Sequence, residues 1–378
     1  MDFQRPKHDI ADIVKQHRSA LERQYRLSKE QKRLLTDIVQ CRTAMLGGHL
    51  EFCENGDFER VAYNSCRNRG CPKCQALAQE RWIAGMRERI LDIGHFHVVT
   101  TAPADLRPLA KRHPAEVYDA LMKSTSEMLL ELGRDRMNLT FGLTLVLHTW
   151  TREMLDHPHA HVLVSAGGLS LTGGEFISVE KYLFPLDMMG KVLRAKMLHA
   201  LSGLRAKGTF PELSDAAFGK LMASLKRQKW NVYAKKPFRK STHVVSYLGR
   251  YTHRMGISNS RLVNVTDDSV TFRTKDGKAA TLHPVEFLWR FLQHVLPKGF
   301  HKIRHAGLYA STRAGGLRDQ ARAALIASGR HQSRSEDHRA TLKSLEQEAK
   351  RCPICGGQLH RIRLSPERPR APPSQTAA

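Results

Sequence analysis

The sequence predicts an α+β fold in which helices flank an antiparallel sheet, together with a small cysteine-rich module near the N-terminus. Strand-like segments are interrupted by amphipathic helical segments, so the chain is neither all-α nor all-β. Turn dipeptides such as Asp276-Gly277 join neighbouring strand segments, which is typical of antiparallel pairing. Five of the seven cysteines lie between residues 41 and 74, which marks that part of the chain as a separate module.

Residues 1–92 are expected to form a helical and cysteine-rich domain. Ser28 and Gln31 fit a capping box, and apolar residues then recur at helical spacing up to residue 40. The elements expected next are strands over 49–53 and 58–65, joined by a turn at 54–57, and a helix over 76–91.

Residues 93–310 are expected to hold the main sheet, and residues 311–378 to form a helical and basic tail. Pro114 should open a helix with a buried face at Val117, Leu121, Met128 and Leu132. Strands are expected at 96–101, 139–148 and 159–165, the last ended by Gly167-Gly168, and in a meander over 261–266, 269–274 and 278–282. Further helices are expected at 185–204, 214–229 and 284–295, and disorder over 361–378.

The net charge of +25 at pH 7 is the least ordinary property of the composition. A surplus of Lys and Arg repels itself unless a polyanion offsets it, and nucleic acid releases counterions when it binds such a surface. Nucleic acid is therefore the expected partner, against the alternative of a basic surface that is only solvated. The sequence has no apolar run of about 18 residues and no signal-peptide core, which predicts a cytoplasmic location without a membrane.

Three histidines lie at or just before the start of the strand expected at 159–165, in the run from Asp156 to Val164. Side chains alternate across a strand, so His159 and His161 should point to one face and Ala160 to the other. Two imidazoles side by side form half of a site for a divalent metal, which can polarise a phosphate. His148 ends the preceding strand, and a hairpin would bring it near the pair as a third ligand. The alternative is that these are ordinary histidines at strand ends.

Two tyrosines are spaced by four residues, at Tyr247 and Tyr251. On a helix they would lie on one face, one turn apart, within strongly basic surroundings. Tyrosine can act as a covalent nucleophile on DNA phosphate. Such a pair is more often a packing feature, but the basic neighbours and the histidines upstream favour catalysis.

The clustered cysteines are interpreted as zinc ligands, because a cytoplasmic protein keeps its thiols reduced. The set chosen for one site is Cys53, Cys66, Cys71 and Cys74, with Cys41 and His49 as weaker candidates. The pair Cys352 and Cys355 forms a second CxxC, which either binds metal or is a partial site.

Basic and aromatic residues alternate on both sides of the tyrosines and among the cysteines. Aromatic rings can stack on bases while Lys and Arg follow the backbone of a single strand. Trp230 could equally be a core residue. The residues expected to contact DNA are Arg67, Arg69, Lys73, Lys229, Trp230, Lys235, Lys236, Arg250 and Arg254.

The order of these motifs resembles a known family. HPHAHVLVSAGG followed by YLGRYTHRMGISNSRL, with SCRNRGCPKCQ and WNVYAKKPF, is similar to rolling-circle transposases of the IS91 type, over roughly residues 30 to 310. These belong to the nucleases with a His-hydrophobic-His motif. By this resemblance, His159 and His161 would bind Mg²⁺ or Mn²⁺, and Tyr247 and Tyr251 would be the catalytic tyrosines. In that family further ligands would be expected at the positions of Gly56 and Gly70.

The resemblance implies a palm-like antiparallel sheet and a structural Zn²⁺ in the N-terminal module. It also implies an enzyme that nicks single-stranded element ends, forms 5′-phosphotyrosine intermediates and transfers the strand into target DNA in the bacterial nucleoid. The sequence does not decide the oligomeric state, although a homo-oligomer is possible. It also leaves open the element-end sequences and the order in which the two tyrosines act.

Three other functions compete with this one. A replication initiator or relaxase would use the same chemistry, but the cysteine module and the absence of a GxxxxGK[ST] motif disfavour it. A non-enzymatic zinc-finger protein would leave the histidines and tyrosines unexplained. A zinc hydrolase would need a general base such as the one in HExxH, which the sequence lacks.

Overall fold

The computed structural model describes residues 6–56, 58–238, 245, 249, 256–310, 316–330, 340, 343–344 and 346–367. Two compact units make up the chain: Met1–Arg81 with His253–Leu292 and Glu336–Ala378, and Trp82–Thr252 with Gln293–Ser335. Each unit combines segments that are distant in the sequence, and the contiguous domain bounds expected from the sequence stay a prediction. No helix in the described ranges is long and apolar enough to cross a membrane.

The first unit contains helices that the sequence anticipated. In α2, the predicted capping box is present, since Ser28 accepts from the backbone of Gln31 and the Gln31 side chain accepts from the backbone of Ser28. Tyr25 stacks on Trp289 with ring centroids 4.0 Å apart, which joins α9 to the N-terminal helices. The helical elements of this unit are α1 (Ile10–Gln24), α2 (Lys29–Gln40), η1 (Ala44–Leu46), η3 (Asn259–Arg261) and α9 (Pro284–Leu292).

Two small antiparallel sheets complete the first unit. One is the predicted meander, formed by β8 (Leu262–Val265), β9 (Val270–Arg273) and β10 (Ala279–Leu282). The other has the order β12-β1-β2, with strands β1 (Gly48–Cys53), β2 (Glu59–Tyr63) and β12 (Leu359–Leu364). The predicted disorder from residue 361 onward is therefore wrong for 361–364, because these residues pair with β1. Residues 368–378 lie outside the described part.

The second unit is built on a large antiparallel sheet with the order β11-β4-β5-β3-β7, and β6 pairs with the end of β5. Its strands are β3 (His95–Thr101), β4 (Leu139–Trp150), β5 (Asp156–Ser170), β6 (Phe176–Ser178), β7 (Val232–Phe238) and β11 (Ile303–Gly307). Its helical elements are η2 (Ala104–Leu106), α4 (Arg107–Arg112), α5 (Pro114–Met137), α6 (Leu186–Ala206), α7 (Asp215–Arg227) and α10 (Leu317–Ala327), and α3 (Ala76–Arg89) leads into it.

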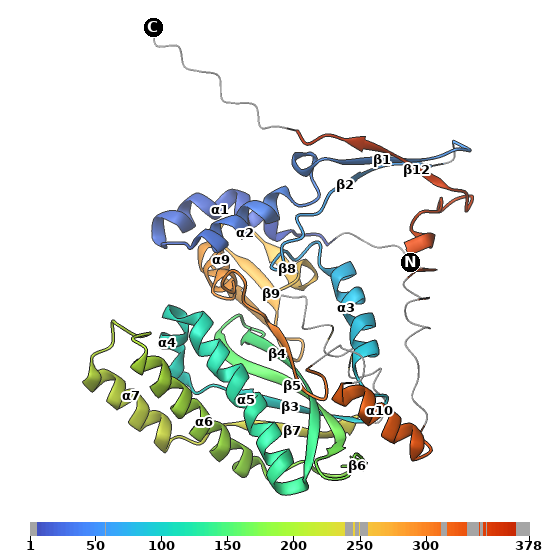
Figure 1. Cartoon of the computed structure of the whole chain (residues 1–378). Coiled ribbons are helices and arrows are strands. Elements are labelled where there is room, and N and C mark those ends of the chain that lie inside the picture. Colours follow the sequence, from blue (N-terminus) through green and yellow to red (C-terminus); the bar gives the residue numbers. More distant parts are fainter. Residues whose placement is uncertain are drawn as a thin grey trace. The chain divides into compact units, whose positions relative to one another are not determined.

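Helices α5 and α6 cover one face of this sheet (Figure 1). Pro114 begins α5 as predicted, and the residues expected on its buried face are all buried. They pack against alternate residues of the strands, including Leu145 on β4 and Val162 on β5. The predicted α+β class, with helices against an antiparallel sheet, is confirmed. The main core lies between these two layers.

Strand β5 is longer than expected at both ends. Gly167 and Gly168 do not end it, because they pair with β6 and the strand continues to Ser170. A side chain at Gly168 would lie 2.2 Å from the backbone oxygen of Thr140, so glycine here permits close packing between strands. Pro158 lies within β5, where its carbonyl accepts a hydrogen bond from Ala102 at 3.0 Å.

The opposite face of the sheet carries a second apolar cluster. Leu163 on β5 contributes to it together with Tyr309, Val245 and residues of α3 and α10. Tyr309 is fully buried, and its hydroxyl lies 2.8 Å from Nε2 of His95 on β3. Because Leu163 shares this face with His161, the cluster borders the histidines of β5.

Candidate functional site

A cluster of histidines lies on the face of the sheet that does not pack against α5 and α6. His148 on β4 is directly opposite His159 on β5, and His161 is two residues further along β5. Side chains alternate along a strand, so these rings share a face, while Ala160 is buried in the core on the other face. One ring nitrogen of each histidine lies within 4.8 Å of the others. The structure thus brings together the three residues that the sequence singled out.

Hydrogen bonds orient the two rings on β5. Nδ1 of His159 donates to the backbone oxygen of His157 at 2.6 Å, so the neutral ring keeps its lone pair on Nε2. Nδ1 of His161 shares a hydrogen bond of 2.8 Å with Nε2 of His97 on β3. The Nε2 atoms of His159 and His161 then lie 3.2 Å apart. Both rings therefore turn these nitrogens toward one another.

This arrangement fits a divalent metal. Imidazole nitrogens at about 2.1 Å from an ion and at right angles to one another lie about 3.0 Å apart, close to the separation in the structure. Burial lowers the pKa of His159 to about 4 and that of His161 to about 2. Both rings are then neutral at neutral pH, which is the form that binds metal. His148, His159 and His161 could together hold a divalent metal ion and leave further positions open for oxygen ligands.

His97 is the residue of this cluster that the sequence analysis missed. It lies in the predicted strand at 96–101, but nothing in the sequence indicates which residue of β5 it faces. In the structure Val99 pairs with His161. His97 is two residues before Val99 on β3, so its side chain lies on the same face as that of His161. Burial lowers the pKa of His97 to about 4, so it too is neutral. A hydrogen-bond partner of this kind fixes the orientation of a metal-binding imidazole.

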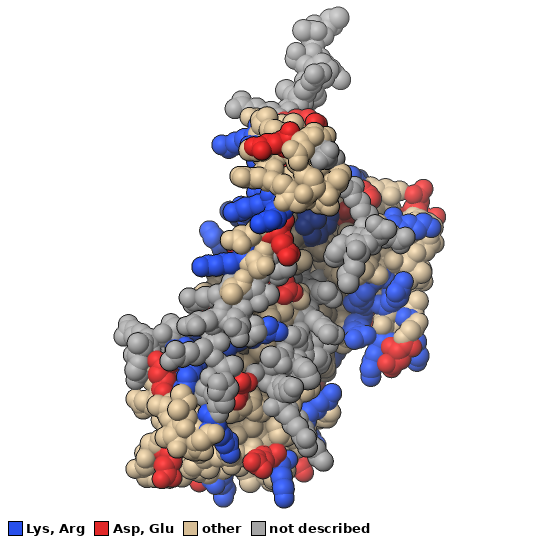
Figure 2. All heavy atoms as spheres, turned by 90° about the vertical axis from the view of Figure 1, so that its right-hand side faces the viewer, with Lys and Arg blue, Asp and Glu red and all other residues tan. Residues whose placement is uncertain are grey.

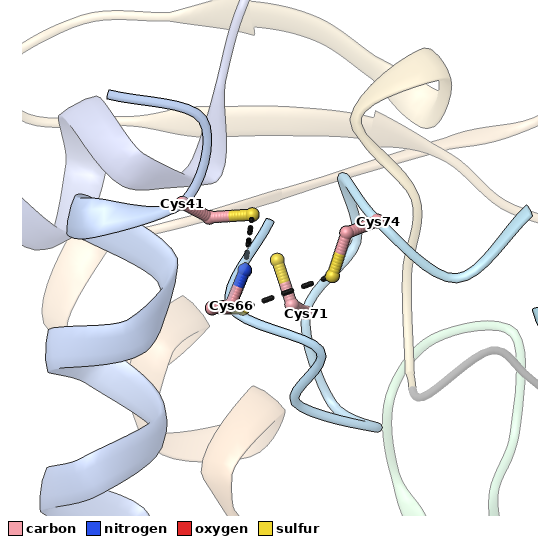
Figure 3. Close-up of side chains that lie close together, drawn as sticks. All are labelled: Cys41, Cys66, Cys71 and Cys74. Carbon is pink, nitrogen blue, oxygen red and sulfur yellow. Dashed lines mark hydrogen bonds between the residues drawn. The ribbon is translucent and has the colours of Figure 1, made fainter. Parts of the chain in front are cut away.

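Four cysteines form a separate cluster in the first unit, at Cys41, Cys66, Cys71 and Cys74 (Figure 3). Cys41 follows the last residue of α2, and the other three lie on the loop between β2 and α3. Asn68 holds this loop, because its side chain donates to Asp37 on α2 at 2.7 Å and its side-chain oxygen accepts from Gly70 at 2.9 Å. The four sulfur atoms lie within 4.8 Å of one another.

The predicted ligand set therefore needs a correction. Cys41, the weaker candidate, takes the place assigned to Cys53, because the end of α2 returns to the loop. Cys53 lies at the end of β1, in another group with Cys352 and Cys355. His49 belongs to neither group, and its Nε2 lies 3.1 Å from Oε1 of Glu51.

The cluster at Cys41 fits structural Zn²⁺. All its cysteines are free thiols, and Sγ of Cys66 and Sγ of Cys74 are 3.7 Å apart, well beyond a disulfide bond. Hydrogen bonds from the neighbouring thiols Cys41, Cys66 and Cys71 lower the pKa of Cys74. Four thiols at one point match the tetrahedral site that zinc prefers.

The residues expected to contact DNA differ in their availability. Arg67, Arg69, Lys229 and Lys235 are exposed, and patches of Lys and Arg are visible on the face in Figure 2. Lys229 pairs with Asp187 at 2.7 Å, and Lys73 with Asp9 at 3.2 Å. Trp230 is 2% exposed and its indole N–H donates to the oxygen of Leu225. The expectation that Trp230 stacks on bases is therefore wrong, since its ring is in the core.

Tyr247 and Tyr251 lie outside the described residues, as do Arg250, Arg254 and the side chain of Lys236. Val245, two residues before Tyr247, is described and is fully buried. It packs in the cluster that contains Leu163, on the histidine face of the sheet. The role of the tyrosines stays a prediction.

Two family models match the chain. A model described as "Transposase zinc-binding domain" matches residues 13–102, which include the cysteine cluster at Cys41. A model described as "Putative transposase" matches residues 142–315, which include the histidines of β4 and β5 and both tyrosines.

Two curated relatives are similar over most of their length. The "Putative transposase y4qJ" of Sinorhizobium fredii is 40% identical over 316 residues, 79% of this chain and 79% of the relative. The "Transposase for insertion sequence element IS801" of Pseudomonas savastanoi pv. phaseolicola is 30% identical over 287 residues, 73% of this chain and 70% of the relative. No solved structure matches significantly. These matches define the class of protein as a DNA transposase.

More narrowly, the chain belongs to the transposases of IS91-type insertion sequences, with a zinc-binding domain in its N-terminal part. The predicted family is thus confirmed, and DNA is the substrate class that it implies.

The corrected ligand set can be tested by removing one thiol. Cys41→Ser should weaken zinc binding at this cluster, because it leaves three thiolates, so the variant should lose one equivalent of zinc at a chelator concentration that leaves the unchanged protein loaded. His49→Ala is the matched control and should keep all zinc, since His49 lies outside the cluster. Metal analysis by mass spectrometry measures both. Loss of zinc in His49→Ala with retention in Cys41→Ser would contradict the assignment.

Proposed function

We propose that this transposase is a metal-dependent nuclease and strand transferase that cuts and rejoins single-stranded DNA through tyrosine nucleophiles. The observation that carries the proposal is the convergence of His148, His159 and His161 on one face of the sheet. A site of neutral imidazoles without a carboxylate in the described cluster suits a metal that must accept phosphate oxygens as further ligands.

The proposed reaction conserves the energy of the phosphodiester bond. The hydroxyl oxygen of Tyr247 or Tyr251 attacks phosphorus, the bond to the 3′ oxygen breaks, and a 3′ hydroxyl leaves. The 5′ phosphate stays on the tyrosine. A free 3′ hydroxyl of another strand then attacks the phosphotyrosine and releases the enzyme. Two tyrosines allow a second cut before the first adduct is resolved.

The histidine cluster would position the scissile phosphate for this attack. When bound, Mg²⁺ or Mn²⁺ would neutralise charge on the phosphate and polarise it. His159 and His161 would hold the ion through Nε2, with His148 as the third ligand. His97 would keep the His161 ring in the required orientation through the hydrogen bond on Nδ1.

The position of Val245 supports a tyrosine segment near this face. Val245 is buried in the apolar cluster with Leu163, which lies two residues from His161 on β5. Tyr247 is two positions after Val245 in the sequence, and a chain of that length spans at most about 7 Å. This short separation from Val245 supports the proposal that a tyrosine attacks a phosphate held at the histidines.

Single-stranded element ends and target DNA are the proposed substrates, and the bacterial nucleoid is the proposed place of action. The net charge of +25 favours binding along a phosphate backbone. Exposed Arg67, Arg69 and Lys235 are the described residues proposed for these contacts. Assembly into a homo-oligomer would let one complex hold both element ends.

The histidine pair can be tested by a double substitution. His159→Ala with His161→Ala should reduce strand cleavage at least about 100-fold, because the metal loses two ligands. DNA binding should change little, since neutral imidazoles add little to phosphate affinity. Cleavage of a labelled single strand with Mn²⁺, and binding to the same strand, measure the two effects.

Two further variants sharpen this test. His97→Ala should weaken Mn²⁺ affinity by about 10–100-fold but keep cleavage at saturating metal, as expected for a residue that orients a ligand. His199→Ala removes an exposed histidine of α6, on the covered side of the sheet, and should cleave normally. Normal cleavage by the variant with both His159→Ala and His161→Ala would contradict the assignment of these histidines as metal ligands.

The tyrosines can be tested by their covalent adducts. Tyr247→Phe combined with Tyr251→Phe should abolish the protein–DNA adduct seen on a denaturing gel, because each change removes the nucleophilic oxygen. Each single variant should keep some adduct but fail in complete transposition. Tyr182→Phe is the matched control, since Tyr182 is 59% exposed and outside the proposed site. An undiminished adduct in the double variant would place the nucleophile elsewhere, with Tyr233 next to be changed.

A further inference from the structure

Cys53, Cys352 and Cys355 form a cluster that joins distant parts of the sequence. Cys53 is the last residue of β1, and Cys352 and Cys355 form the CxxC just before β12. Antiparallel pairing of β1 with β12 sets Cys53 opposite Leu359 and so brings the CxxC back to the end of β1. Their sulfur atoms lie within 4.8 Å of one another.

The sulfur atoms of this cluster are close together but are not joined by a disulfide bond. Sγ of Cys53 lies 3.3 Å from Sγ of Cys355, which is too far for a disulfide bond. Cys53 and Cys352 are 4% and 3% exposed, so two of the thiols are removed from water. Placing three sulfur atoms so close together adds little to stability unless they bind a metal or form a disulfide.

The backbone around the CxxC is shaped for thiolate sulfur. The N–H of Ile354 donates to Sγ of Cys352 at 3.4 Å, and the N–H of Gly356 donates to the oxygen of Cys352 at 2.9 Å. Gly356 has φ +74°, a conformation that glycine adopts without strain. A side chain at Gly357 would lie 3.3 Å from Sγ of Cys355 and 3.8 Å from Sγ of Cys53. Glycine at 357 therefore keeps space open beside the sulfur atoms.

We propose that Cys53, Cys352 and Cys355 bind a second Zn²⁺ through three thiolates. Reduced thiolates select zinc among the common divalent ions, and binding releases the three thiol protons. The three thiolates leave the fourth position of a tetrahedral zinc ion for another ligand. The side-chain amide of Asn55 donates to Sγ of Cys355 at 3.5 Å, which stabilises the thiolate.

This zinc links β12 to the hairpin that β1 and β2 form. Glu51 on β1 already pairs with Arg60 on β2 and with Arg361 on β12, at 2.5 and 2.8 Å. The sheet order β12-β1-β2 therefore has its own ionic contacts, and the metal adds a link between residues about 300 positions apart. The other contacts of β12 include the pairing with β1, the ion pair of Arg361 with Glu51 and the contact of His360 with Glu54.

Zinc stoichiometry tests the proposal. The chain with His159→Ala and His161→Ala, which removes the histidine cluster as a further zinc site, should contain two zinc ions after equilibration with a slight excess of Zn²⁺ and gel filtration. Cys355→Ser should contain one, because Cys355 is exposed and its loss removes a ligand without opening the core. Cys66→Ser combined with Cys71→Ser should also contain one, because two thiolates remain at that cluster, and the chain with all three cysteine changes should contain none. A single zinc in the chain with all its cysteines, or two in Cys355→Ser, would overturn the proposal.

Thiol protection gives a second readout on the unchanged chain, independent of how the variants fold. Alkylation mapped by mass spectrometry should leave Cys352 and Cys355 unmodified until a chelator is added. Their modification should then precede that of Cys41, because three thiolates hold zinc less firmly than four. Trypsin should also cut β12 at Arg361 or Arg363 only after chelation. Immediate alkylation of Cys355 in zinc-loaded protein, or a disulfide at Cys53, would reject the site.

Discussion

The antiparallel pairing of β4 with β5 is the constraint on which the histidine cluster depends. This register sets His148 opposite His159 and leaves His161 on the same face. A shift by one residue would send the histidines into the apolar layer against α5 and α6, and would expose Ala160 and Val162. The burial of Ala160, Val162 and Val164 therefore fixes the position of the nitrogens that are proposed to bind metal. Packing on one face of the sheet sets the arrangement of the histidines on the other.

Burial also sets the protonation of the cluster. Imidazoles in water would be partly protonated near pH 6.5, and the strongly basic chain would favour the neutral form further. In the structure, burial lowers the pKa of His159 and His161 far below that value. A cation can then approach them without displacing protons. In the proposed function, the positive surface would bind the DNA, while the imidazoles of the cluster would be uncharged before a metal ion binds.

The sequence predicted the local features of the site and missed those that depend on long-range register. Alternation along one strand was enough to place His159 and His161 on one face, and the hairpin placed His148. His97 was missed because the offset between β3 and β5 is fixed by packing. Cys53 was chosen in place of Cys41 for the same reason, because tertiary packing decides which cysteine lies beside Cys66, Cys71 and Cys74.

Other errors came from residues whose environment the sequence does not specify. Trp230 stands among basic residues, yet its ring is buried. Residues 361–364 begin a segment rich in Pro and Arg, yet they belong to β12 because β1 offers an edge with Glu51 as partner for Arg361. In both cases tertiary contacts outweighed local composition. The helices and the meander were predicted because caps, turns and periodicity are local signals.

Electron paramagnetic resonance of bound Mn²⁺ would test the central claim most directly. The protein should bind one Mn²⁺ whose spectrum shows nitrogen couplings from imidazole, and His159→Ala should remove part of this coupling. The unpaired electrons of Mn²⁺ couple only to nuclei in its immediate surroundings, so the result does not depend on activity. Mn²⁺ surrounded by oxygen ligands alone, or no bound Mn²⁺, would contradict a metal centre built on the histidines of β4 and β5.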